Sequence, residues 1–290
     1  MTLTLNASVK PKRAKQPGKQ VFPRRDLGLG ISVQILDITS TMADDWLHKR
    51  MSRIQRPVSE VEVDMLNRHI TSGKWLLNGE TIVFDTNNEC INGRRRLTAC
   101  ARSGKSIRSI VVWGIPSAAY HTIDVGLARK NTDALRSAGI HYESAVSAAC
   151  QILFRYEKGM PIAPTRKIGR YMLSPIEILD LAKKYKGLEE YALKASKAAK
   201  VLHSLGVATS LYYLVEKIDS DQAYNFFEGL GTGSNLAKGS PVLTLRDRVM
   251  PTRLDTDVVA HMSWLAWNAF RENKPLRFEF MRTGPLPKLV

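Results

Sequence analysis

The 290-residue sequence lacks any uninterrupted apolar run of the roughly 18 to 20 residues that a membrane-spanning helix needs. Its first residues also lack the apolar core of a signal peptide. We therefore expect a cytoplasmic protein with no membrane partner. Cysteine is scarce as well: Cys90, Cys100 and Cys150 form no C-x-x-C pair, which argues against a disulfide framework and against a zinc site. All three are expected to be reduced thiols.

Acidic residues are few beside basic ones, with 27 Asp and Glu against 43 Lys and Arg. The resulting formal charge of +16 attracts polyanions, which include nucleic acid, nucleotide phosphates and an anionic membrane surface. Charge alone does not choose among these partners. The histidines have no metal-ligand spacing, so no metal site is predicted; they are His48, His69, His121, His141, His203 and His261.

Residues 1–30 have the composition of a basic arm, with three prolines and a single acid, Asp26. Such an arm can reach a phosphate backbone, and it can equally be a disordered tail that keeps the protein in solution. If the first interpretation holds, the residues that contact nucleic acid are Lys10, Lys12, Arg13, Lys15, Arg24 and Arg25, with Lys19 beside them.

The segment from residue 31 to 140 alternates between strand and helix patterns. Apolar alternation predicts strands at 31–38, 81–85, 90–91 and 107–112. Helical spacing predicts helices at 59–70 and 95–103, the first beginning at Ser59 and the second ending at Gly104. From residue 141 to 290 the signals are almost wholly helical, with cap-and-proline starts at Ser174-Pro175 and Ser240-Pro241.

These patterns predict an α+β, or mixed α/β, fold. It comprises a small mixed sheet with helices in residues 31–140, followed by an all-α domain in residues 141–290.

The run from Cys90 to Ala99 places a glycine turn between a strand and a helix, with three arginines at the start of that helix. The first N–H groups of a helix have no internal acceptors and carry the positive end of its dipole, so this geometry binds anions. Gly93 allows the backbone to approach a ligand closely, and arginine adds bidentate donors. The sequence thus predicts a phosphate site at Asn92, Gly93, Arg94, Arg95 and Arg96, although an ordinary turn with a solvated basic face fits the spacing as well.

The order of these elements resembles the ParB/sulfiredoxin superfamily over about residues 31–140. Asn92 to Ala99 is similar to the G-E-R-R-x-x-A box of ParB partition proteins and to the D-G-Q-H-R-L-x-A box of phage and plasmid relatives, with Gly93, Arg96 and Ala99 matching both. Upstream, Arg56-Pro57-Val58-Ser59 resembles their arginine-containing loop. Downstream, Ile123 to Leu135, with Arg129 and Lys130, resembles their I-D-x-G…R-x-x-D-x-L stretch.

The resemblance implies a nucleoside triphosphate, CTP or ATP, bound by the box and by Arg56, with magnesium as a candidate companion ion. It also implies DNA as a partner, with Arg129 and Lys130 among the contacts, and leaves a homodimer open. Arg94 stands where ParB has glutamate and where sulfiredoxin has its catalytic cysteine, so peroxiredoxin repair is not expected. No catalytic residue is assigned. The alternatives are a nuclease or nucleotide-dependent phosphotransferase using the same pocket, and a structural or partner-binding protein.

Several other residues have two interpretations each. Asp124 and Asp133 could hold a metal or form charge pairs with their basic neighbours, and pairing is favoured. Trp264 and Trp267, at helical spacing, indicate core packing rather than base stacking, as do Tyr212 and Tyr213. For another group a solvated helix face is favoured over contact with phosphates: Lys194, Lys197 and Lys200.

Overall fold

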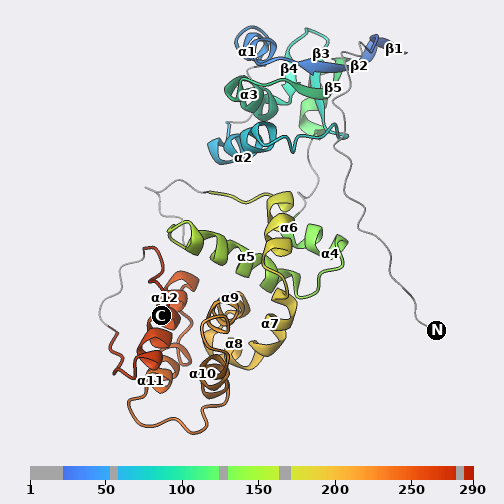
Figure 1. Cartoon of the computed structure of the whole chain (residues 1–290). Helices are drawn as coiled ribbons and strands as arrows, with labels where there is room; N and C mark the ends of the chain where they lie inside the picture. The colour runs from blue at the N-terminus through green and yellow to red at the C-terminus, as the bar shows by residue number, and fades with distance from the viewer. Residues whose placement is uncertain (1–21, 53–57, 124–129, 163–170, 279–283) are drawn as a thin grey trace, which may run out of the picture. The chain divides into compact units, whose positions relative to one another are not determined.

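The computed structural model describes residues 22–52, 58–123, 130–162, 171–278 and 284–290. The chain divides into two compact units, one ending at Val125 and the other beginning at Gly126. Within the described residues no helix is long and apolar enough to span a membrane. The predicted class is confirmed: a mixed sheet with helices comes first and a largely helical region follows (Figure 1).

The first unit is built on a five-stranded sheet in the order β1-β2-β5-β3-β4. Strand β5 is central, antiparallel to β2 and parallel to β3, so the sheet is mixed. Strand β4 pairs antiparallel with β3 at one edge, and β1 pairs antiparallel with β2 at the other. The strands are β1 (Arg25–Gly28), β2 (Ile31–Ile38), β3 (Thr81–Asp85), β4 (Cys90–Asn92) and β5 (Ile107–Ile115).

Helix α3 (Arg94–Ser103) connects β4 to β5 and packs between α1 (Ser40–Lys49) and α2 (Glu60–Thr71) (Figure 1). Its apolar face, with Leu97 fully buried, joins the core formed by the sheet and the three helices. This packing fixes the start of α3 directly after the short strand β4. A 3₁₀ turn (Ser117–Thr122) follows β5.

The folded part begins before Ile31, where the sequence analysis placed the end of the basic arm. Strand β1 lies within residues 25–28, and the Gln34 side chain donates to the carbonyl of Phe22. Arg24 donates to Ser32 Oγ at 2.6 Å and its guanidinium lies 4.4 Å from the ring centroid of Trp113. These contacts hold Arg24 on the sheet rather than on an arm. Residues 1–21, with Lys10, Lys12, Arg13, Lys15 and Lys19, lie outside the described residues.

The described part of the second unit is helical. Its elements are α4 (Asn131–Ser137), α5 (Glu143–Glu157), α6 (Pro175–Lys184), α7 (Leu188–Lys194), α8 (Ser196–Leu202), α9 (Leu205–Val215), α10 (Ser220–Thr232), α11 (Pro241–Val249) and α12 (Thr256–Arg271). The predicted cap-and-proline starts are present, because Ser174 Oγ accepts from Glu177 N and Ser240 Oγ accepts from Leu243 N.

Helix α4 belongs to this second unit, although the sequence analysis ended the first domain at residue 140. Leu135 is fully buried in a cluster with Val146 of α5 and Ile178 of α6. Burial of the Leu135 side chain packs α4 against the helices that follow it in the chain. The boundary between the units accordingly lies near residue 125.

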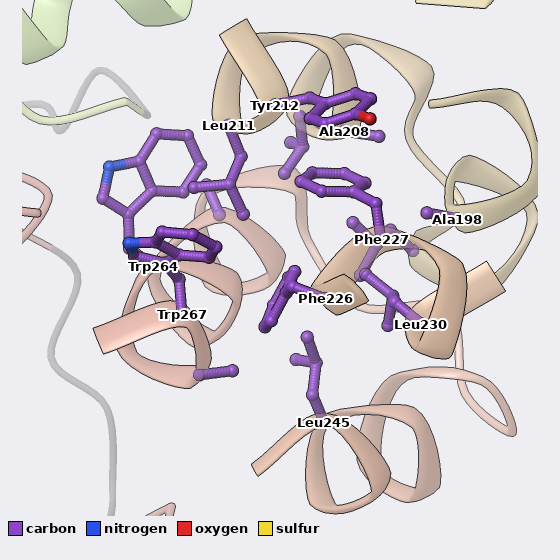
Figure 2. Packing of buried hydrophobic residues seen from close by; sticks show 14 of the residues in the cluster. Ala198, Ala208, Leu211, Tyr212, Phe226, Phe227, Leu230, Leu245, Trp264 and Trp267 are labelled. Carbon is purple, nitrogen blue, oxygen red and sulfur yellow. The ribbon is translucent and has the colours of Figure 1, made fainter. Parts of the chain in front are cut away.

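The largest core of the second unit surrounds α9 (Figure 2). Phe226 and Trp267 meet edge to face with ring centroids 5.5 Å apart, and Tyr212 stacks on Phe227 at 4.3 Å. Nine of the eleven residues of α9 are buried. Helices α8 and α9 are joined by a short turn, as the two helices of a DNA-binding helix-turn-helix motif are. Because α9 is buried, however, it has no exposed face with which to enter a DNA groove.

Candidate phosphate site at the start of helix α3

The turn between β4 and α3 requires glycine. Gly93 is the N-cap of α3 and has φ 108°, a left-handed backbone that side chains resist. A Cβ at this position would lie 2.8 Å from Ile82 Cγ1 on the neighbouring strand β3. The glycine therefore brings the start of the helix tightly against the sheet. The sequence predicted a close approach of this backbone to a ligand, which the contact with Ile82 does not test.

The first turn of α3 consists of Arg94, Arg95 and Arg96. The helix ladder begins with Leu97 N, which donates to the carbonyl of Gly93. The amides of this first turn carry the positive end of the helix dipole. No acidic side chain occupies this turn. Backbone donors and cationic side chains together make this turn suitable for an anion.

The arginine side chains leave the helix in different directions, because successive residues are about 100° apart around its axis. Arg95 Nη1 lies 2.7 Å from Glu62 Oε2 on α2. Arg96, whose side chain is 12% exposed, lies 3.8 Å from Glu80 Oε2 and donates to Asn92 Oδ1 at 3.3 Å. Arg94 is half-buried. The structure thus gathers Asn92 to Arg96 at one turn, with Arg95 and Arg96 held by polar partners of the same unit.

The remaining predicted binding residues lie elsewhere or outside the described residues. Arg56 and Arg129 fall in undescribed segments. Arg25 is exposed on the edge strand β1, and Lys130 is the N-cap residue of α4 in the second unit.

Two aspartates, Asp85 and Asp133, have structural roles. Asp85 is buried and its carboxylate accepts from the amides of Asn87 and Glu89 and from Ser117 Oγ, which fixes the β3–β4 turn. Asp133 accepts from the amide of Lys130 and so caps the start of α4. Asp124 lies outside the described residues.

Among the residues that the structure describes, the carboxylates of α1 are not part of a metal-binding group. Asp44 pairs with His48 and Asp45 with Lys49, each one helical turn apart. Across the parts of the chain that the structure describes, no three His, Cys, Asp or Glu side chains gather closely enough to hold a metal ion.

The three cysteines are buried, and none of them forms a disulfide. Burial raises the pKa of Cys100, which is part of α3, to about 11. Its thiol donates weakly to the carbonyl of Ile38. A buried thiol with a raised pKa reacts poorly, because little of it is present as thiolate.

In the second unit, the predicted aromatic residues pack in the interior. Trp264 and Trp267 are fully buried, and Tyr212 and Tyr213 nearly so. Two lysines of the predicted stripe form ion pairs at the surface, since Lys194 lies 2.9 Å from Glu216 and Lys197 lies 3.5 Å from Glu228. The preferred interpretations, core packing and a solvated helix face, agree with these positions.

Sequence reasoning missed Glu62 and Glu80, the carboxylates beside Arg95 and Arg96. Both lie far from the arginine run in the sequence, and glutamates on a helix or before a strand are common. Only the packing of α2 against α3 brings Glu62 to the site. Their effect is to supply an internal counter-charge to the proposed anion site.

Comparison of the chain with protein-family models, with curated proteins and with solved structures finds no match.

Proposed function

We propose that the chain is a nucleotide-phosphate-binding, DNA-associated protein of the ParB-like phage and plasmid type. The observation that carries the proposal is Gly93 at φ 108°, which opens α3 with three consecutive arginines. The triphosphate of CTP or ATP, with or without magnesium, is placed at the amides of Arg94 to Arg96. The order of strand, glycine turn, helix and strand around this site supports a ParB/sulfiredoxin-like assignment.

DNA association rests on the charge of the whole chain, +16, and on the basic residues before Phe22. Because α9 has no exposed face that could enter a DNA groove, we expect duplex DNA to be bound mainly through its phosphates, largely independent of base sequence. In this proposal the nucleotide occupies the first unit, and DNA is held by exposed lysines and arginines outside the α3 turn.

Calorimetry with CTP and with ATP, each with magnesium, tests the nucleotide site. Arg96→Ala should weaken binding by about 1.5 to 3 kcal/mol, the range of a charge-assisted hydrogen bond. Arg102→Ala is the matched control, because it removes the same charge from the last turn of α3, where Arg102 pairs with Glu60. Equal affinities for the wild type and Arg96→Ala would refute the site.

The same samples distinguish the other functions. Steady phosphate release, or nicking of plasmid DNA with magnesium, would assign an enzyme to this pocket. Tight binding without turnover is the result expected for a nucleotide-responsive DNA-binding protein. Absence of both binding and turnover would favour a structural or partner-binding protein.

A further inference from the structure

Two glutamates in the first turn of α2, Glu60 and Glu62, each form an ion pair with an arginine of α3. Glu60 forms a bidentate pair with Arg102, with N to O distances of 2.5 and 3.1 Å. Glu62 lies 2.7 Å from Arg95. Arg95 and Arg102 are seven residues apart and so lie on one face of the helix. Of these two pairs, the Glu62–Arg95 pair is the one at the end of α3 where a phosphate would bind.

A carboxylate and a phosphate compete for the same donors of a guanidinium. Both accept bidentate hydrogen bonds from arginine, and both are anions. The Glu62 side chain is 35% exposed and that of Arg95 is 45% exposed, so water and ligand reach the pair. Exposed pairs of this kind are weak, and a competing anion can therefore break them.

We propose that Glu62 is an internal competitor for the phosphate site. It occupies Arg95 when no ligand is bound and gives way when the phosphate arrives, which lowers the affinity for anions in general. The inference rests on the proposed function, because it concerns the same turn of α3. Glu62 acts through Arg95 and is thus a positioning residue.

Calorimetry of CTP with magnesium at low salt tests the competition. Glu62→Gln should bind about two- to fivefold more tightly than the wild type, the range that corresponds to the strength of an exposed pair. Glu60→Gln makes the same charge change two residues away and should leave the affinity unchanged. Added salt should shrink the gain, because screening weakens the pair that Glu62→Gln removes.

A double-mutant cycle separates competition from a general change of charge. In the Arg95→Ala background, Glu62→Gln should have no further effect, because the arginine for which Glu62 competes is gone. Thermal melting without ligand checks that each variant is folded.

An unchanged or weaker affinity in Glu62→Gln, an equal gain in Glu60→Gln, or a gain that persists without Arg95 would each overturn the inference. Wild-type binding together with any of these results leaves the proposed function intact. If neither the wild type nor Glu62→Gln binds CTP or ATP, both the inference and the nucleotide site are wrong.

Discussion

Gly93 combines two demands that no other residue type meets: a backbone at φ 108° and close contact with Ile82. Gly104, at the other end of α3, has φ 64° but nothing within 4 Å of an added Cβ. At either position, an alanine in this left-handed conformation would lower the free energy of unfolding by about 1 to 2 kcal/mol. At Gly93 it also crowds Ile82, which adds about 1 to 3 kcal/mol.

Gly93→Ala should therefore lower the free energy of unfolding by clearly more than Gly104→Ala does. Urea unfolding of the two variants beside the wild type measures this difference. Equal destabilisation of both variants would mean that the turn is not packed against β3 as described.

The sequence predicted the need for glycine at position 93 from its place between a strand and an arginine-rich helix start. It did not predict where the arginines point. Arg95 and Arg96 contact Glu62 and Glu80, and these pairings depend on how α2 and the segment before β3 pack beside α3. Contacts between residues far apart in the sequence depend on the three-dimensional packing, which local patterns do not contain.

At the scale of elements, Asp37 on β2 and Arg108 on β5 stand directly opposite each other in the sheet. Two hydrogen bonds of 2.7 Å join them, and this bonding from Arg108 holds the pKa of Asp37 below its usual value. A carboxyl with a lowered folded-state pKa stabilises the fold above its unfolded pKa of about 3.9. That stability is lost as the pH falls through the folded pKa.

Asp37→Asn should cost at most about 1 kcal/mol at pH 7, because the Asp37 side chain is 42% exposed. The difference from the wild type should shrink as the pH drops below about 4. Chemical unfolding at a series of pH values measures it. A difference that stays constant down to pH 2 would show that the ionised carboxylate contributes nothing specific.

Strongly patterned elements were predictable and weakly patterned ones were not. Strands β2, β3 and β5 and helices α2 and α3 follow apolar spacing that is visible in the sequence. Strand β1 was assigned to the arm because residues 1–30 are basic and contain three prolines. The structure shows that its four residues are all exposed, so they have no apolar alternation to reveal a strand. Helix α1 was not predicted, since only Ala43 and Trp46 of its ten residues are buried, too few to reveal a period.

For the whole molecule, the position of β1 determines how the basic arm can be tested. Removal of all of residues 1–30 would delete β1, so a deletion that tests the arm must end before Phe22. The deleted segment then contains five basic side chains and no acids: Lys10, Lys12, Arg13, Lys15 and Lys19. If these residues lie on DNA phosphates, the salt dependence of binding should become shallower by up to about 4 to 5 units, at roughly 0.9 for each phosphate neutralised.

Electrophoretic or fluorescence titrations of duplex DNA at several salt concentrations give the two slopes. The deletion should leave β1 and its contacts with β2 in place, so nucleotide binding should persist. Identical affinity and slope before and after the deletion would show that the arm does not contact DNA.

The central claim is that nucleotide phosphate binds at the turn from Asn92 to Arg96. Titration of the ¹⁵N-labelled protein with CTP and magnesium, followed by amide chemical shifts, tests its location most directly. The account predicts saturable shifts that are largest for Gly93, Arg94, Arg95 and Arg96. Saturable shifts that cluster elsewhere, or no shifts with either CTP or ATP at millimolar concentration, would contradict it.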